Sequence, residues 1–249
     1  MPVLVLSPRY SPDSRSLARA ADVARWDVER LHTWGIPSEL RDRRDIVIYG
    51  EHLFGEFLRD HLRIGLVEPP DDLLQRLPVD LRRRDVRLMP YREAQKETAP
   101  RFIKPPNFKN FKAAVYSSGI DLPDNSELVT DDVLVSEVVK WDVEFRCFIL
   151  NGAVVDLSAY ARNGSLNATA DLRESWNATA DEIASARATA TAVIACGIEL
   201  PVVYALDVGH IANKGWAVVE ANAAWGSGIY GCDPARILPV LQRAVVNAG

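Results

Sequence analysis

The stretch Val203 to Gly228, VYALDVGHIANKGWAVVEANAAWGSG, decides the fold because it places polar side chains inside two runs that otherwise read as buried strands. Asp207 lies in the first run, and Glu220 and Asn222 lie in the second. Residues two apart in a strand point to the same face of the sheet, so Glu220 and Asn222 share a face. The register of the hairpin then decides whether Asp207 joins them.

The turn between the two runs sets that register. A two-residue turn at 213–214 pairs Asp207 with Glu220, whereas a turn at 214–215 pairs Asp207 with Asn222. Both registers put the three polar side chains on one face, and only a loop of odd length would separate them.

Two carboxylates side by side on a sheet repel each other, and the repulsion grows as water is excluded. A compensating positive charge is therefore expected. Asp207, Glu220 and Asn222 offer oxygen ligands only, a set that suits Mg²⁺ or Mn²⁺. The alternative is that one carboxylate faces solvent at a sheet edge and the other pairs with an arginine. The close spacing of three such residues favours the metal site.

Basic side chains earlier in the chain suggest a phosphate-binding site. Glu144 and Arg146 share a face of the run VEFRCFI, so each charge is satisfied by the other or by a ligand. Arg162, just beyond the following strand, adds a guanidinium that can bind phosphate oxygens in bidentate fashion. Lys104, in FIKP, either reaches a nucleotide phosphate from the end of its strand or extends its ammonium group into solvent.

The first part of the chain alternates short apolar runs with amphipathic ones. We expect strands over 3–6 and 45–49 and helices over 14–34 and 50–62. This alternation is typical of a small parallel α/β layer. The basic run 82–84 that follows is expected to form a solvated helix face, and the alternative is that it contacts a polyanionic substrate.

The second part, from Lys96, is richer in hairpins, of which the strongest signal is Asn151-Gly152. Its other expected elements are strands over 101–105 and 133–139, a helix over 181–196, a hairpin of 202–208 with 216–222, and a helix from Pro234. The sequence thus predicts an α/β (α+β) protein with an N-terminal α/β domain at 1–95 and a second domain at 96–249.

Composition narrows the class of protein. With 249 residues, 48% hydrophobic and 25% charged, the chain is typical of a globular protein. Its 29 Lys and Arg against 34 Asp and Glu give a net charge of −5, which is no strong signal for nucleic acid or an anionic membrane. Three scattered cysteines form no zinc-binding spacing, and the apolar run at the N-terminus is short for a signal peptide or a membrane span. We expect a cytoplasmic protein.

Taken in order, the segments FIKP, SEVVKWDVEFRCFI, ALDVG and VVEANAAWGSG resemble the ATP-grasp superfamily, and within it most closely the R-two-K clade of small ATP-grasp domains. The resemblance covers roughly 96–249, and the first part is similar to the small α/β domain that precedes many such modules. Its most specific feature is an Asp, then a Glu thirteen residues later, then an Asn two further on. The resemblance implies an ATP-grasp fold.

The resemblance also implies roles for the charged residues. Asp207, Glu220 and Asn222 would hold the Mg²⁺ (or Mn²⁺) ions that bridge the phosphates of ATP. Lys104 would contact the α- and β-phosphates, Arg146 the γ-phosphate, and Arg162 the phosphoryl-transfer site or the acidic substrate. Many members of the superfamily close a glycine-rich loop over the phosphates, whereas this chain has PPNFKNFKAAVYSSG at that place. We therefore expect Lys109 or Lys112 to contact the phosphates by charge instead.

The strand end at Glu137, Val138 and Val139 resembles the hinge whose backbone meets adenine, and Glu144 is expected at the ribose or at a metal-bound water. The activity that the resemblance implies is ATP- and Mg²⁺-dependent ligation of a carboxylate to an amine through an acyl-phosphate. The expected partners are ATP, a carboxylate and an amine, the latter two as small molecules or as peptide or protein ends.

Two other functions compete with the ligase. The chain could be a nucleotide-binding or protein-interaction module without turnover, which would show no magnesium-dependent ligation. The segment GSGIYG also matches a dinucleotide-binding turn, G-x-G-x-x-G. That motif requires a following helix, a further parallel strand and an acidic residue about 20 positions on, and the printed chain has no room for them after Gly231.

Overall fold

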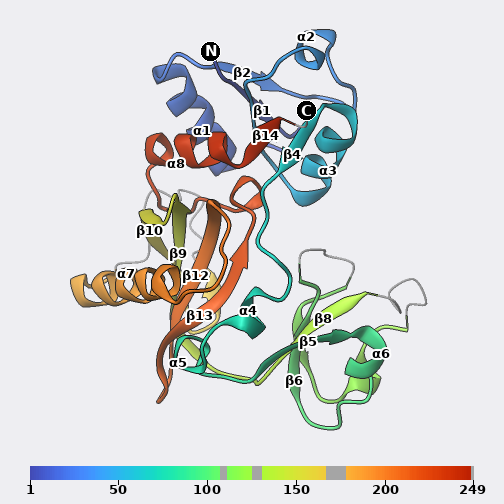
Figure 1. Cartoon of the computed structure of the whole chain (residues 1–249), viewed down its shortest axis with the longest axis vertical. Helices are drawn as coiled ribbons and strands as arrows, with labels where there is room; N and C mark the ends of the chain where they lie inside the picture. Colours follow the sequence, from blue (N-terminus) through green and yellow to red (C-terminus); the bar gives the residue numbers. More distant parts are fainter. Residues whose placement is uncertain (107–110, 125–130, 167–177, 248–249) are drawn as a thin grey trace.

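The computed structural model describes residues 1–106, 111–124, 131–166 and 178–247. Three bodies follow one another down the long axis in Figure 1: an α/β layer that holds both ends of the described chain, a large antiparallel sheet, and a small sheet. The mixed α/β and α+β class expected from the sequence is confirmed.

The α/β layer contains a parallel sheet of order β2-β1-β3. Its elements are β1 (Val3–Leu6), α1 (Pro12–Val23), β2 (Asp27–Arg30), α2 (Ser38–Arg41), β3 (Ile46–Tyr49) and α3 (His52–His61). The helix expected over 14–34 is wrong beyond Val23, where the chain turns and forms β2. Arg25 adopts a left-handed φ of 60° there, and a single left-handed residue cannot continue a right-handed helix.

The C-terminal segment completes this same layer. Strand β14 (Val245–Asn247) pairs antiparallel with β4 (Ile64–Leu66). Helix α8 (Pro234–Arg243) packs against α1 and β3. One hydrophobic core therefore joins Leu4 and Leu17 to Leu241. Helix α8 begins as expected at Pro234, with the side chain of Asp233 as its cap.

The small sheet has the order β5-β8-β6-β7. The segment contains α4 (Leu73–Arg76), α5 (Val79–Arg82), β5 (Val86–Pro90), α6 (Tyr91–Ala94), β6 (Arg101–Lys104), β7 (Ala114–Tyr116), a 3₁₀ turn η1 (Gly119–Asp121) and β8 (Asp132–Ser136). Because β5 pairs with β8, residues 86–90 belong to the sheet that carries Lys104. The division at residues 95 and 96 stays a prediction, and this pairing favours an earlier boundary.

The large sheet is antiparallel, with the order β11-β10-β9-β12-β13 and helix α7 packed against it. Its elements are β9 (Trp141–Leu150), β10 (Ala153–Arg162), β11 (Ser165–Leu166), α7 (Ala180–Ala195), β12 (Val203–Ile211) and β13 (Gly215–Asn222), with a 3₁₀ turn η3 (Ala224–Gly226) after them. The β9–β10 hairpin turns at Asn151 and Gly152, both with positive φ, as a type I′ turn requires.

Candidate nucleotide and metal site

The β12–β13 hairpin places Asp207 directly opposite Glu220. It does so by a route that differs from both expected turns. Ile211 pairs with Gly215, so the loop has three residues, the odd length that by itself would separate the carboxylates. A β-bulge at Val219 adds one residue to β13 and restores the shared face.

Asp207 is fully buried and accepts two hydrogen bonds from Arg146. Nε donates to Oδ1 at 2.8 Å and Nη2 donates to Oδ2 at 2.7 Å, while Nη1 donates to the carbonyl of Gly228 at 3.1 Å. Burial raises the pKa of Asp207 and the charge of Arg146 opposes that rise. A bidentate arrangement between a guanidinium and a carboxyl group is strongest when both are ionised, so we assign this buried pair as charged.

Glu220 is held by Lys104 from the small sheet. The Lys104 Nζ lies 2.5 Å from Oε2, and Asn222 Nδ2 donates to Oε1 at 2.9 Å. Burial raises the pKa of Glu220, but Lys104 outweighs burial and the net value falls to about 2. The ammonium group of Lys104 therefore points to the acidic hairpin and not into solvent, with a side chain only 15% exposed.

A cavity of about 360 Å³ opens between the two sheets and gathers most of the residues expected to contact ATP. Lys104, Glu144 and Glu220 line it together with 137–139. Its remaining walls include the apolar side chains of Val86, Phe102, Leu134 and Trp141. A mainly apolar cavity that also exposes charged side chains fits a base and its phosphates.

A second cavity, of about 670 Å³, lies between the α/β layer and the hairpin. The α/β layer contributes residues that include Ser7, Asp13, Tyr49 and His52, and the large sheet and the loop after it contribute others that include Arg146, Asn222, Trp225 and Tyr230. Glu220 lines both cavities, so the acidic hairpin stands where they meet.

Two expected site residues lie elsewhere. Arg162, at the end of β10, forms a bidentate pair with Glu182 of α7, with both distances 2.8 Å. Lys112 is exposed, and its carbonyl accepts a hydrogen bond from Tyr116. Neither Arg162 nor Lys112 is among the described residues that line the two cavities, and their catalytic and phosphate-binding roles stay predictions. Lys109 lies outside the described residues.

Arg84 is a site residue that the sequence reasoning missed. Within the run 82–84, expected on a solvated face, it is only 8% exposed. Its guanidinium donates to the carbonyls of Val218 and Val219 at 2.5 and 2.7 Å and to Ser136 Oγ at 3.2 Å, and it lies 5.1 Å from the ring centre of Trp141. Burial lowers the pKa of Arg84 to about 10, so it stays charged at neutral pH.

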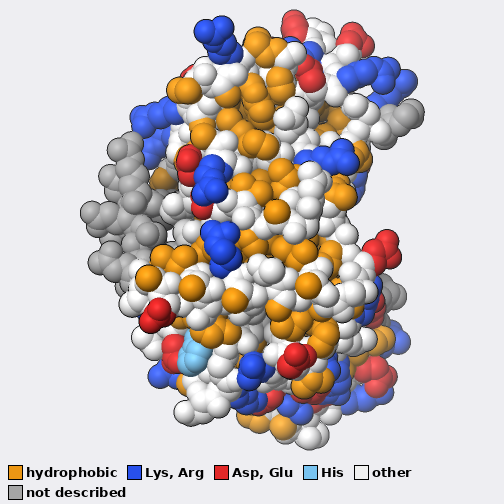
Figure 2. Space-filling model, turned by 60° about the vertical axis from the view of Figure 1, so that its left-hand side comes forward, with side chains coloured by type: hydrophobic (Ala, Val, Ile, Leu, Met, Phe, Trp, Pro, Cys, Tyr) orange, Lys and Arg blue, Asp and Glu red, His pale blue; other side chains and the backbone are white. Residues whose placement is uncertain are grey.

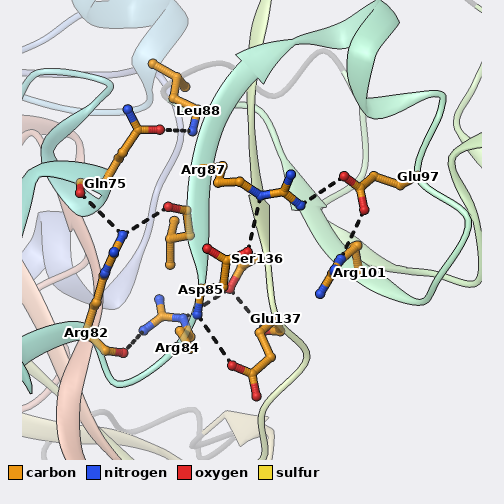
Figure 3. Close-up of polar contacts among 11 residues, drawn as sticks. Gln75, Arg82, Arg84, Asp85, Arg87, Leu88, Glu97, Arg101, Ser136 and Glu137 are labelled. Carbon is orange, nitrogen blue, oxygen red and sulfur yellow. Dashed lines mark hydrogen bonds and ion pairs between the residues drawn. The ribbon is translucent and has the colours of Figure 1, made fainter. Parts of the chain in front are cut away.

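Arg84 therefore fixes the bulge that precedes Glu220 and ties it to the start of β5. Figure 3 shows Arg84 beside Ser136, apart from a neighbouring set of ion pairs in which Arg87 and Arg101 both contact Glu97. In the sequence, nothing distinguishes Arg84 from Arg82 and Arg83, the other two arginines of the basic run.

Two tyrosines complete the surroundings of Arg146. The rings of Tyr160 and Tyr230 stack at 4.8 Å with an interplanar angle of 11°, and the guanidinium of Arg146 lies 5.5 and 5.0 Å from their centres. The sequence reasoning missed both. The one signal for Tyr230 was its place in the loop GSGIYG, next to the predicted metal ligands.

The donor set fits a hard divalent cation in part. Glu220 and Asn222 line the larger cavity and offer carboxylate and amide oxygens there. Asp207 is buried, and Arg146 occupies both of its oxygens, so only its remaining lone pairs are available to an ion. In the part of the chain that the structure describes, no group of three or more His, Cys, Asp and Glu side chains is arranged to hold a metal. The three-residue metal site stays a prediction.

Comparison with solved structures finds the same fold over nearly the whole chain. A RimK domain ATP-grasp protein from Sphaerobacter thermophilus DSM 20745 is 14% identical, with a TM-score of 0.61 over 98% of this chain and 99% of that one. D-cycloserine synthetase DcsG is 16% identical, with a TM-score of 0.59 over 96% and 98%. N5-carboxyaminoimidazole synthetase from Staphylococcus aureus is 11% identical, with a TM-score of 0.61 over 99% and 78%.

At these identities the likeness shows the fold alone. The search of curated proteins finds no match. The family model described as the ATP-grasp domain of R-two-K clade family 2 matches residues 81–240, well over half of the chain. That span includes Lys104, Arg146 and the acidic hairpin, and it begins just before Arg84. This protein belongs to the R-two-K clade of the ATP-grasp superfamily.

Proposed function

We propose that the protein is an ATP- and Mg²⁺-dependent carboxylate–amine ligase that works through an acyl-phosphate. The observation that carries this proposal is the position of Glu220, which lies at the junction of an apolar cavity and a polar one with Lys104 and Asn222 bound to it. A ligase of this kind must bring a nucleotide and a carboxylate to one point from opposite sides.

The smaller cavity suits the nucleotide. Its apolar walls, with Phe102 and Trp141, would enclose adenine beside the backbone of 137–139. The ammonium group of Lys104 would then contact the phosphates, and Glu144, which also lines this cavity, would contact the ribose. Among the structural neighbours, the N5-carboxyaminoimidazole synthetase from Staphylococcus aureus has been solved in a complex with ADP, with a TM-score of 0.60 and 10% identity.

Glu220, Asn222 and Asp207 would hold the divalent cation. When bound, Mg²⁺ neutralises charge on the phosphate oxygens during phosphoryl transfer. The two carboxylates are now balanced by Lys104 and Arg146, the same two cations expected to contact the phosphates. Lys104 and Arg146 would turn to the phosphates when ATP binds, and Glu220, Asn222 and the remaining lone pairs of Asp207 would hold the ion.

The reaction needs positioned charges and no nucleophilic side chain. An oxygen of the donor carboxylate attacks the γ-phosphorus of ATP, the bond to the β-phosphate oxygen breaks, and ADP leaves. A neutral amine then attacks the acyl carbon, the carbon–oxygen bond breaks, inorganic phosphate leaves, and the amine loses a proton to form the amide. Arg146, beside the γ-phosphate, would stabilise the negative charge that spreads over its oxygens.

The larger cavity would hold the carboxylate and the amine. Its walls mix serines, carboxylates and aromatic rings, a lining suited to a polar small molecule or a peptide end. A RiPP-associated ATP-grasp ligase from Chryseobacterium gregarium, solved with ADP and with leader and core peptides, has a TM-score of 0.51 to this chain.

On the face shown in Figure 2, Lys and Arg side chains are scattered among acidic ones and form no continuous basic stripe. None of the described helices is both long and apolar enough to span a membrane.

Calorimetric titration of ATP, with and without Mg²⁺, tests the proposal. Lys104→Ala should weaken ATP binding in both conditions, because the ammonium acts on the phosphates directly. Glu220→Gln should weaken it by about tenfold or more only when Mg²⁺ is present, because the carboxylate acts through the metal. A wild-type protein that binds no ATP in either condition would contradict the nucleotide site and leave an interaction module. If the protein binds ATP but releases no ADP with any carboxylate and amine offered, it is a nucleotide-binding protein without ligase activity.

A further inference from the structure

Tyr230 holds a backbone conformation that its side chain disfavours. Its φ is +49°, in the left-handed region that glycine adopts freely and bulky residues rarely occupy. The same loop contains glycines at 226, 228 and 231, so glycine is common in this segment. Strain of this kind persists where the surrounding structure imposes it, and it is concentrated at functional sites.

The ring of Tyr230 forms part of the wall between the two cavities. It stacks on Tyr160 at 4.8 Å, and Tyr160 lines the smaller cavity while Tyr230 lines the larger one. Arg146 lies against both rings, and Glu220 lines both cavities. The stacked pair therefore stands at the place where the nucleotide and the carboxylate would meet.

The two hydroxyl groups of the stack differ in their partners. The Tyr160 hydroxyl donates to Glu144 Oε2 at 3.1 Å. Across the described residues, the hydroxyl of Tyr230 has no hydrogen-bond partner, although the ring is half-buried and surrounded by polar groups. A donor held on a strained backbone beside Arg146 is suited to an oxyanion that arrives with a ligand.

We propose that Tyr230 is a catalytic residue whose hydroxyl donates a hydrogen bond to the terminal phosphoryl group of ATP, next to Arg146. This inference rests on the proposed function. If the base and ribose occupy the smaller cavity and the carboxylate approaches through the larger one, the γ-phosphate lies at their junction. Tyr230 then acts on the oxygens of the transferred group, and it is unused when ADP is bound.

The test compares the affinities of ATP and ADP in the presence of Mg²⁺, measured by calorimetry on the full chain. Tyr230→Phe keeps the ring and the stack and removes only the hydroxyl, so it should weaken ATP binding about tenfold and change ADP binding less than twofold. Tyr204→Phe is the matched control, because the Tyr204 hydroxyl is buried and unpartnered in the part of the chain that the structure describes and lines neither cavity. It should change neither affinity.

Tyr230→Gly separates the function of the side chain from its place in the fold. Glycine suits the left-handed φ, so a purely structural role predicts a folded protein with unchanged preference for ATP over ADP. Our proposal predicts that this variant, like Tyr230→Phe, loses the preference. An unchanged ATP affinity in Tyr230→Phe would overturn the inference while leaving the nucleotide site standing. A wild-type protein that binds neither nucleotide would instead overturn the proposed function, and this inference with it.

Discussion

The two cavities that meet at Glu220 are built from the chain in different ways. The residues that line the smaller one fall between Leu74 and Glu220, and all of them except Leu74 lie within the family match. The larger one takes some of its lining residues from between Ser7 and Glu68 and the others from between Arg146 and Tyr230. Helix α8 packs in the same core as both segments. Only the larger cavity depends on the α/β layer, so its lining can vary between proteins while the smaller cavity stays the same.

Asp207→Ala is expected to have the largest effect, because it breaks a buried ion pair whose Arg146 lines the larger cavity. Removal of the carboxylate leaves the guanidinium of Arg146, 6% exposed, without its counter-ion. Loss of one partner of such a pair costs about 3–5 kcal/mol in the free energy of unfolding. Urea denaturation measures this, with Asp142→Ala as control, since Asp142 pairs with His210 with a side chain 42% exposed. Similar losses in the two variants would contradict the role assigned to the pair.

Arg84→Gln should weaken ATP binding, because Arg84 lines the smaller cavity and supports the bulge before Glu220. The variant loses the hydrogen bonds to the two carbonyls at the bulge, so Glu220 is held less firmly and ATP affinity in Mg²⁺ should fall about tenfold. Arg87→Gln is the matched control in the same strand region, because Arg87 pairs with Asp85 and Glu97 instead. Calorimetry gives both affinities. If the two variants bind ATP equally well, the bulge does not depend on Arg84.

Glu182→Gln should have the smallest effect, since the Arg162–Glu182 pair lies outside both cavities among the described residues. The pair holds the folded-state pKa of Glu182 at about 2, below the ordinary value of 4.5. Its stabilisation is therefore complete above about pH 4.5 and is lost as the pH falls towards 2. We expect the variant to lose about 1 kcal/mol at pH 7, less than about half of that at pH 3, and little at pH 2, measured by urea unfolding.

Glu199→Gln is the control for that measurement, because Glu199 is exposed and forms no ion pair with another described residue. A Glu182→Gln effect that persists unchanged at pH 3 would contradict the link to ionisation. If Glu182→Gln also lowered ATP turnover, the Arg162–Glu182 pair would belong to the site, and the contrast between the site and its surroundings would be lost.

The pairing within the acidic hairpin was predictable from the sequence, because spacing within strands determines which side chains share a face. Asp207 and Glu220 pair as one predicted register requires, and Lys104 contacts the hairpin from another sheet. The bulge at Val219 was not predictable, since its support comes from Arg84, 134 residues earlier in the chain than Val218. Contacts of that separation depend on tertiary packing and leave no periodic pattern.

The same reasoning explains the other differences. The helix expected over 14–34 ends at Val23 because amphipathic spacing does not reveal a left-handed residue at Arg25. Tyr230 carries no periodic signal either, since it lies in a loop whose conformation is set by the elements around it. Spacing thus predicted which hairpin side chains share a face, and it missed residues positioned by loops and long-range contacts.

The return of α8 and β14 to the first layer bears on the order in which the molecule can fold. During synthesis α1 leaves the ribosome roughly two hundred residues before α8, yet the two helices pack together and share one core. The α/β layer, although made first, cannot bury that core until the rest of the described chain has been translated. We infer that this layer completes its folding only after α8 has been made, so that the large and small sheets can form before the surface that completes the larger cavity.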